Sequence, residues 1–161
     1  MTQSDEDIFN TTGIRLKDAF VVIVKTSWNS HVTDLLLEGC VKKLDSDGVA
    51  YTILEVPGAF EIPFAIQQYH QHNPRKAQAF IALGCIIRGN TPHFEYISQS
   101  VTQGLTQLNI SLGFPVIFGV LTVNSQVQAD ERTGGRQGHK GEEAAATAIQ
   151  MIALSNAIKN A

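Results

Sequence analysis

The stretch 82–96, ALGCIIRGNTPHFEY, combines residue types that can bind an anion and move a proton. Thr91 and Pro92 form a helix-start signal, because threonine caps helix N-termini and proline is tolerated at the first helical position. His93 would then lie in the first helical turn, beside free backbone N–H groups and the positive end of the helix dipole. Because histidine titrates near neutral pH, the stretch predicts an anion site with a proton-transfer group beside it.

Other unusual residues follow the carboxyl ends of predicted strands, where ligands bind in open parallel sheets. Trp28 follows the first strand, 58–61 the second, 85–93 the third and Thr122 the fourth, so we expect them at one edge. Trp28, the single tryptophan, lies in a polar loop, which fits either a partly buried anchor or an aromatic plate for a planar heterocycle. A lone histidine at a helix start is more often a solvated or capping group, and it is the position at this edge that favours a function for His93.

Two basic residues flank the glycine-rich run 133–141, which is predicted to be a mobile loop. Arg132 and Lys140 are either solvated charges or cations that close on an anionic substrate. The glycine spacing matches neither a P-loop nor a dinucleotide fingerprint, and no catalytic triad order or metal-ligand set is evident. The residues alone therefore predict a pocket without cofactor or metal, suited to a planar ring plus a phosphate, with one histidine for proton transfer.

The elements that must position these residues alternate regularly between strand and helix. Since the strands are continuously apolar, we expect an α/β fold: a four-stranded parallel sheet, doubly wound, with helices on both faces. Residues 1–17 are polar and acidic and are expected to be a flexible arm before a single domain, 18–161. The predicted strands cover about 19–24, 49–56, 80–83 and 115–121, and the predicted helices cover about 32–48, 63–71, 92–112, 126–132 and 142–156. Ser30 is expected to cap the first of these helices, and Gly113 is expected to end the third.

Composition argues against several classes of protein. The 161 residues are 43% hydrophobic and 17% charged with a net charge of −3. Without a Lys/Arg-rich block, no footprint for a nucleic-acid backbone is expected. Cys40 and Cys85 lie in apolar runs at a spacing typical of neither a disulfide framework nor a metal site, so we expect reduced, buried thiols in a cytoplasmic protein. No apolar run approaches membrane-spanning length, and we expect no secretory signal in the polar N-terminal stretch.

The chain resembles the 6,7-dimethyl-8-ribityllumazine synthase family from about Phe20 to Leu154, with its motifs in the family's order and spacing. The resemblance implies a flavodoxin-like, three-layer fold and a transferase of riboflavin biosynthesis. That enzyme condenses 5-amino-6-(D-ribitylamino)uracil with 3,4-dihydroxy-2-butanone 4-phosphate and releases phosphate and water. The motifs are VPGAFEIP at 56–63, IRGNTPHFEY at 87–96 and PVIFGVLT at 115–122, followed by a weaker match, GHKGEEAA, at 138–145.

The resemblance also implies roles for residues that would bind the pyrimidine substrate. Trp28 would stack on the pyrimidine, where most family members have phenylalanine, and Phe118 would come from the adjacent subunit. Because tryptophan is a larger plate, we hypothesise a measurable affinity for riboflavin. The uracil and ribityl site would be lined, largely through backbone groups, by Ala59, Phe60, Glu61, Cys85, Ile86 and Ile87.

Other residues would serve the phosphate substrate and the proton transfers. Asn90 and Thr91 would hold the butanone phosphate together with Arg132, although Asn90 replaces the small residue usual in the family. His93 would shuttle protons. Lys140 matches a family lysine near the site.

The family assembles as pentamers, and in some members twelve pentamers form a hollow 60-subunit shell. The resemblance therefore implies a homopentamer that binds two small-molecule substrates, and it permits a shell. Two alternatives stay open: a flavin-binding or container protein without catalysis, and a related pentameric riboflavin synthase. His93, Arg132 and Glu61 argue against the first, and the phosphate-binding features at Thr91 and Arg132 argue against the second, because dismutation of the lumazine needs no phosphate site.

Overall fold

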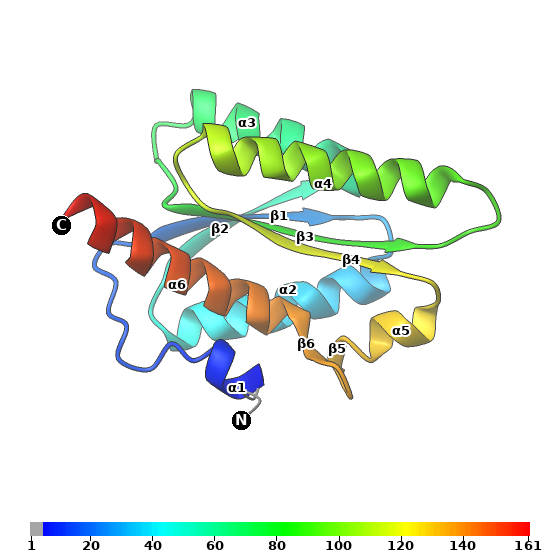
Figure 1. The fold of residues 1–161 in the computed structure, drawn as a ribbon, viewed down its shortest axis with the longest axis horizontal. Helices are drawn as coiled ribbons and strands as arrows, with labels where there is room; N and C mark the ends of the chain where they lie inside the picture. The colour runs from blue at the N-terminus through cyan, green and yellow to red at the C-terminus, as the bar shows by residue number, and fades with distance from the viewer. Residues whose placement is uncertain (1–4) are drawn as a thin grey trace.

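A four-stranded parallel sheet with the strand order β2-β1-β3-β4 forms the centre of the molecule (Figure 1). In this computed structural model, which describes residues 5–161, helices cover both faces of the sheet. This is the predicted doubly wound α/β fold, in which parallel neighbours need crossover connections. The strands are β1 (Phe20–Thr26), β2 (Ala50–Val56), β3 (Ala79–Ile87) and β4 (Val116–Val123). Helices α3 (Ile62–His72) and α4 (His93–Ser111) cover one face, and α2 (Ser30–Ser46) and α6 (Lys140–Lys159) cover the other.

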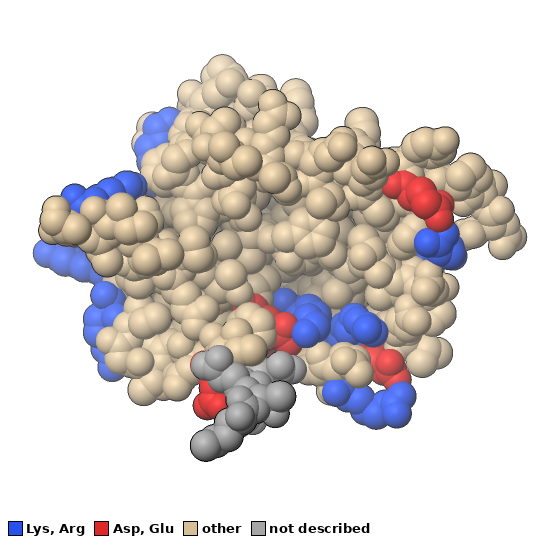
Figure 2. Space-filling view, in the orientation of Figure 1, with Lys and Arg blue, Asp and Glu red and all other residues tan. Residues whose placement is uncertain are grey.

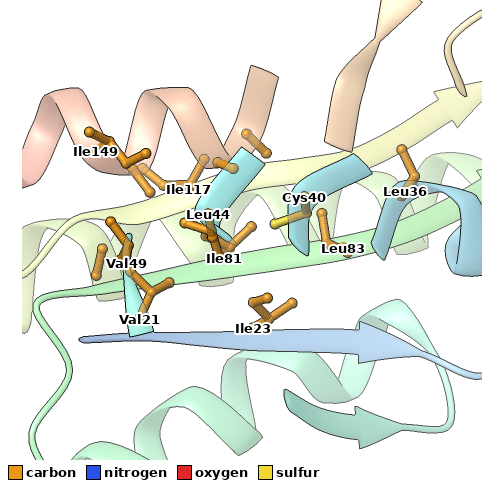
Figure 3. Packing of buried hydrophobic residues seen from close by; sticks show 14 of the residues in the cluster. Val21, Ile23, Leu36, Cys40, Leu44, Val49, Ile81, Leu83, Ile117 and Ile149 are labelled. Carbon is orange, nitrogen blue, oxygen red and sulfur yellow. The ribbon is translucent and has the colours of Figure 1, made fainter. Parts of the chain in front are cut away.

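Strand β1 is buried along its whole length and separates two hydrophobic clusters. Val21 and Ile23 belong to the cluster with α2 and α6 (Figure 3), while Val22 and Val24 belong to the cluster with α3 and α4. This division follows from the alternation of side chains along a strand. Strand β2 is an edge strand with exposed and half-buried positions. The continuous apolar pattern therefore indicated burial on both faces correctly for β1 but not for β2.

Strand β3 is longer than the predicted run 80–83 and continues to Ile87. Gly84 does not interrupt it, because this residue pairs in register with Val120 of β4. A Cβ atom at Gly84 would lie 3.3 Å from the Cγ2 atom of Thr26, so the glycine permits close packing inside the sheet. Gly113 has a φ of 73° and follows α4, which confirms the predicted glycine stop of that helix.

The run 133–141 forms a hairpin that leads into α6 rather than the irregular loop predicted there, and its mobility stays a prediction. Strands β5 (Thr133–Gly135) and β6 (Gly138–His139) pair antiparallel after the short helix α5 (Gln126–Asp130). Gly134 and Gly138 have φ values of 108° and 78°, which glycine adopts without strain. These glycines therefore permit the tight turn of the hairpin.

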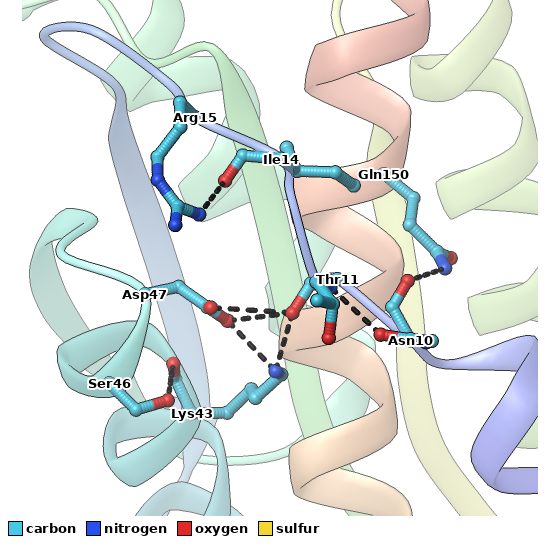
Figure 4. Close-up of polar contacts among 9 residues, drawn as sticks. Asn10, Thr11, Ile14, Arg15, Lys43, Ser46, Asp47 and Gln150 are labelled. Carbon is cyan, nitrogen blue, oxygen red and sulfur yellow. Dashed lines mark hydrogen bonds and ion pairs between the residues drawn. The ribbon is translucent and has the colours of Figure 1, made fainter.

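The segment before β1 packs against α2 and α6 after a short helix, α1 (Asp5–Ile8). Thr11 is buried, and its hydroxyl donates to Asp47 at 3.1 Å while it accepts from the Lys43 ammonium at 2.6 Å (Figure 4). The Gln150 amide donates to the Asn10 carbonyl at 3.1 Å. Side chains of both helices therefore hold this part of the chain.

The flexibility expected of an arm over residues 1–17 stays a prediction, as does the division into this arm and a single domain, 18–161. Residues 1–4 lie outside the part of the chain that the structure describes. In the part described, no helix combines the length and apolar character that crossing a membrane would require.

Candidate functional site

A cavity of about 470 Å³ lies at the carboxyl ends of β1, β2 and β3, and we call it the Trp28 cavity. It brings together every residue predicted for the pyrimidine and ribityl site except Phe118, and it adds His93. Gly58, from the run 58–61 expected at this edge, also lines it, whereas Thr26, Asn29 and Ile97 were missed from the sequence. The residues predicted from the sequence that line it are Trp28, Ala59, Phe60, Glu61, Cys85, Ile86, Ile87 and His93.

Trp28 lies in the loop between β1 and α2, and its side chain is 74% exposed. Its backbone N–H donates to the Pro57 carbonyl at 2.9 Å, which joins the loop to the end of β2. An indole this exposed is not a buried anchor, so the aromatic plate is the interpretation that the geometry favours. The next residue, Asn29, has a φ of 58° and caps α2 in place of the predicted Ser30. The Asn29 side chain donates to the Cys85 carbonyl at 2.9 Å, which leaves it no part in capping the helix.

A 3₁₀ turn, η1 (Ala59–Glu61), forms a second part of the lining. The Glu61 carboxylate accepts a hydrogen bond from the Gly58 N–H at 3.0 Å, so this side chain fixes its own turn. Phe60 lies between them in the chain and is 58% exposed. The turn therefore presents a second exposed aromatic ring in the lining of the cavity.

The carboxyl end of β3 supplies Cys85, Ile86 and Ile87 from within the strand rather than from a loop. Cys85 is a free, buried thiol, as is Cys40 in α2, and both agree with the prediction. Burial raises the pKa of Cys85 to about 11, and the charge of Asp130 acts in the same direction. The thiol is therefore protonated at neutral pH and offers no nucleophile to the cavity.

His93 is the first residue of α4, one position later than the predicted helix start. It is exposed, and its N–H donates to the Thr91 hydroxyl at 3.4 Å. Asn90 and Thr91 lie in the exposed turn just before the helix, and neither is among the residues that line the Trp28 cavity. The structure therefore places the histidine in the cavity and the two predicted phosphate-binding residues beside it.

Arg88 links the turn before α4 to the end of β4 and to the first turn of α4. Its Nε atom donates to the Asn124 side chain at 2.9 Å, beyond the end of β4. Its guanidinium pairs with Glu95 and lies 4.3 Å from the centre of the Phe94 ring. The Arg88 hydrogen bond lowers the pKa of Glu95, which keeps this pair ionised. Arg88 thus ties the first turn of α4, and with it His93, to the neighbouring strand.

A second cavity, of about 580 Å³, lies along β4 and α6, and we call it the β4 hollow. Among the described residues, none lines both cavities. The carboxyl end of β4 lies at the expected edge of the sheet, because Thr122 pairs with Ile86 of β3, but Thr122 lines this hollow and not the Trp28 cavity. The predicted site residues that line the hollow are Phe118, Arg132 and Lys140, together with Thr122.

The hairpin β5–β6 brings the two cations of the hollow together. The Lys140 N–H donates to the Arg132 carbonyl at 2.8 Å, at the base of the hairpin. The Lys140 ammonium pairs with Glu143 at 2.8 Å, and the Arg132 guanidinium donates to the Gln128 carbonyl at 2.8 Å. Figure 2 shows basic and acidic side chains side by side on this face, where α6 begins. The described residues contain no group of three or more His, Cys, Asp or Glu side chains that could hold a metal ion.

Comparison with known proteins gives one consistent result. A family model described as 6,7-dimethyl-8-ribityllumazine synthase matches residues 18–156. The chain is 45% identical over 141 residues to a 6,7-dimethyl-8-ribityllumazine synthase of Porphyromonas gingivalis, a match that covers 86% of each chain. It is 43% identical to the protein of that name from Parabacteroides distasonis, covering 83% of this chain and 84% of the relative. For the Bacteroides fragilis protein the identity is 44%, with 81% and 92% covered.

Proposed function

The chain belongs to the 6,7-dimethyl-8-ribityllumazine synthase family, and from this premise we propose which of its residues bind the substrates and move the protons. The protein is a transferase of riboflavin biosynthesis. It condenses 5-amino-6-(D-ribitylamino)uracil with 3,4-dihydroxy-2-butanone 4-phosphate to give 6,7-dimethyl-8-ribityllumazine, phosphate and water.

The pyrimidine substrate binds in the Trp28 cavity. The exposed indole of Trp28 stacks on the flat ring, and Phe60 presents a second aromatic surface. Backbone groups at the end of β3 and in the turn η1 supply the directed hydrogen bonds that a uracil and a ribityl chain require. The remaining lining residues are Ala59, Glu61, Cys85, Ile86 and Ile87.

His93 moves the protons of the reaction. The substrate amine attacks the ketone to give an imine, phosphate leaves by elimination, and ring closure completes the product, with water expelled on imine formation and on closure. Each step needs a proton delivered or removed, and a positioned histidine contributes roughly 10²–10⁴-fold to such steps. His93 is supported by its place in the cavity and by its exposure at the start of α4.

The phosphate of the second substrate lies at the start of α4, beside Asn90 and Thr91. Free N–H groups and the helix dipole favour an anion there. No Lys or Arg is among the described residues that line the Trp28 cavity, so within one chain the site lacks a cation. We assign that cation to Arg132 of an adjacent subunit, with Lys140 near it.

The active site therefore forms between two subunits. One observation carries this proposal: the residues predicted for a single site line two separate cavities of the chain. Phe118 is 46% exposed on an edge strand, as expected of a ring that completes the pocket of a neighbour. A closed ring of subunits repeats such a heterologous contact, which supports the homopentamer and permits the 60-subunit shell. We also propose a cytoplasmic location.

Complementation between two inactive variants tests the shared site. His93→Ala damages the half around the Trp28 cavity, and Arg132→Ala damages the half in the β4 hollow. In assemblies that mix the two variants at random, about a quarter of the sites join two intact halves. We expect each variant alone to be slow and their co-expressed mixture to regain activity, measured by the absorbance of the lumazine product.

A matched mixture provides the control. His93→Ala and Trp28→Ala damage the same half, so no combination of these chains restores a site, and no recovery is expected. Recovery in neither mixture would contradict the shared site. The same assay separates the enzyme from a container protein without catalysis and from a riboflavin synthase, because only the condensing enzyme consumes both substrates.

Two further measurements address assembly and ligand. Light scattering gives the particle mass, which for a pentamer is about five times the 17.5 kDa of the chain. Titration of riboflavin against Trp28 fluorescence measures the affinity that we propose for flavin-like rings. An emission that riboflavin leaves unchanged would contradict that affinity.

A further inference from the structure

We propose that Lys25, Glu55 and Ser27 are positioning residues, which hold the loop that carries Trp28 and thereby set the affinity for the pyrimidine substrate. The inference rests on the proposed function, because it assumes that Trp28 stacks on the ring. The resemblance implies no role for any of these three residues, and none of them lines the Trp28 cavity.

The network begins at a lysine inside the sheet. Lys25 lies near the carboxyl end of β1, opposite Glu55 of β2, and is only 5% exposed. Its ammonium lies 2.5 Å from an Asp34 carboxylate oxygen and 3.6 Å from one of Glu55. Burial lowers the pKa of Lys25, but hydrogen bonds and charges from the two carboxylates outweigh it and leave the pKa raised. The lysine is therefore charged, and it holds both partners in place.

These two partners belong to the two elements that adjoin the Trp28 loop. Asp34 belongs to the first turns of α2, which follows the loop, and Glu55 belongs to β2 beside it. One buried ammonium therefore fixes the distance between the two elements that flank the loop. An unpaired buried lysine is costly, so the two carboxylates offset the cost of burying Lys25.

Glu55 also contacts the Trp28 loop directly. Its carboxylate accepts a hydrogen bond from the Ser27 hydroxyl at 2.6 Å. This hydrogen bond and the charge of Lys25 lower the pKa of Glu55, so it stays an acceptor at neutral pH. The Ser27 N–H also donates to the Val56 carbonyl at 2.8 Å. Ser27, which precedes Trp28, is therefore held by its side chain and by its backbone.

The position of Trp28 depends on these contacts of Ser27, because the indole ring itself makes few contacts. The indole is 74% exposed, and it forms no hydrogen bond with any residue in the described part of the chain. Its backbone is held by the Pro57 carbonyl at 2.9 Å and by the Thr26 hydroxyl, which donates to the Trp28 carbonyl at 3.3 Å. The direction of the ring therefore follows from the loop backbone, which the network fixes one residue earlier.

A second cluster of the same composition lies away from the cavity and provides a control. Lys43, Asp47 and Thr11 again combine an ammonium, a carboxylate and a hydroxyl, with 2.9 Å between the Lys43 and Asp47 charges (Figure 4). This cluster joins the N-terminal segment to the end of α2. Removing its hydroxyl perturbs stability without touching the Trp28 loop.

Ser27→Ala is the direct test, because Ser27 is exposed and its loss leaves no uncompensated buried charge. Trp28 is the only tryptophan, so fluorescence anisotropy of the ligand-free enzyme reports this loop alone. We expect lower anisotropy and a KM for the pyrimidine substrate raised roughly three- to tenfold, as for the loss of one ordinary intramolecular hydrogen bond. The KM for the butanone phosphate should stay unchanged. Ser27→Thr, which restores a hydroxyl, should recover both values, and Thr11→Val should alter neither.

Two outcomes overturn different claims. Unchanged anisotropy and unchanged KM in Ser27→Ala, with only a lower Tm, would show that the network is purely structural and would overturn the positioning role. Trp28→Ala tests the proposed function separately. An unaltered pyrimidine KM in that variant would remove Trp28 from substrate binding, whatever the anisotropy of Ser27→Ala shows.

Discussion

The Trp28 cavity and the β4 hollow are two halves of unlike construction. The Trp28 cavity lies where three strands of the sheet end, and its lining contains exposed aromatic rings and a histidine but, in the described chain, no Lys or Arg. The β4 hollow lies along the outward side of an edge strand, and its lining contains two cations and an exposed phenylalanine. Each half holds what the other lacks, which is the arrangement expected of a site shared between subunits.

The two halves also differ in how their polar groups are held. In the β4 hollow, Lys140 is paired with Glu143 and Arg132 donates to a backbone carbonyl. In the Trp28 cavity, no ion pair or side-chain hydrogen bond within the described residues holds the His93 ring. A cation that waits for a phosphate benefits from being held in place, whereas a group that serves several proton transfers needs freedom to turn.

The largest effect is expected from replacing His93, the proton-transfer group in the Trp28 cavity. His93→Ala should lower kcat by roughly 10²–10⁴-fold, because proton transfer is lost. The KM values of both substrates should change little, since binding comes from other residues. Steady-state kinetics with the lumazine product as readout checks this. Full activity would show that the cavity binds substrate without supplying the proton-transfer group.

The next effect is expected from a cation in the β4 hollow. Arg132→Ala should raise the KM for the butanone phosphate about 10- to 100-fold, since charge-assisted hydrogen bonds contribute about 1.5–3 kcal/mol. The pyrimidine KM should stay near its value. Arg136→Ala is the matched control, because Arg136 lies on the same hairpin with an exposed side chain paired to Glu131. Equal effects on both substrates would place Arg132 outside the phosphate site.

A smaller effect is expected from the close contact of α2 with the start of α6. A Cβ atom at Gly141 would lie 2.0 Å from the Leu36 carbonyl oxygen, so Gly141→Ala forces the two helices apart. Such overpacking costs about 1–3 kcal/mol, which a denaturant titration measures. Because Lys140 precedes this glycine, the phosphate KM should rise while Trp28 fluorescence stays unchanged. A change confined to Trp28 would show that the two halves are not structurally separate.

The sequence predicted much more of the first half than of the second. The Trp28 cavity consists largely of short segments at and just after the ends of strands, and such positions can be found from strand ends. The hairpin that joins Arg132 to Lys140 depends on backbone hydrogen bonds, and its glycines suggested mobility instead. That β4 is an edge strand, with Phe118 exposed, depends on strand order, which the alternation of strands and helices does not specify.

Two features near the Trp28 cavity also differ from what the sequence suggested. Ser30 was the expected cap of α2, but Asn29 adopts a left-handed conformation and uses its side chain to reach Cys85 across the sheet. The sequence did not indicate that Lys25 is buried, because a charged residue at a strand end is usually solvated. Its pairing with Asp34 and Glu55 depends on three elements meeting in space.

The smallest effect is expected from the two buried thiols, Cys40 and Cys85. Burial raises the pKa of Cys40 to about 12, and that of Cys85, at the Trp28 cavity, to about 11. The folded protein therefore keeps protons that the unfolded chain, with an ordinary thiol pKa of 9.0, releases. Stability from each thiol is complete below that value and falls as pH rises toward the folded pKa, by about 1.4 kcal/mol per thiol one unit above it. Chemical denaturation between about pH 8 and pH 10 measures this loss, and Cys40→Ser and Cys85→Ser should each remove the part of the loss that comes from that thiol.

Alkylation of the native protein should reach Cys85 at lower pH than Cys40, because Cys85 lies in the lining of a cavity and Cys40 is enclosed beneath α6. The reverse order would mean that the α2–α6 side opens more readily than the floor of the Trp28 cavity.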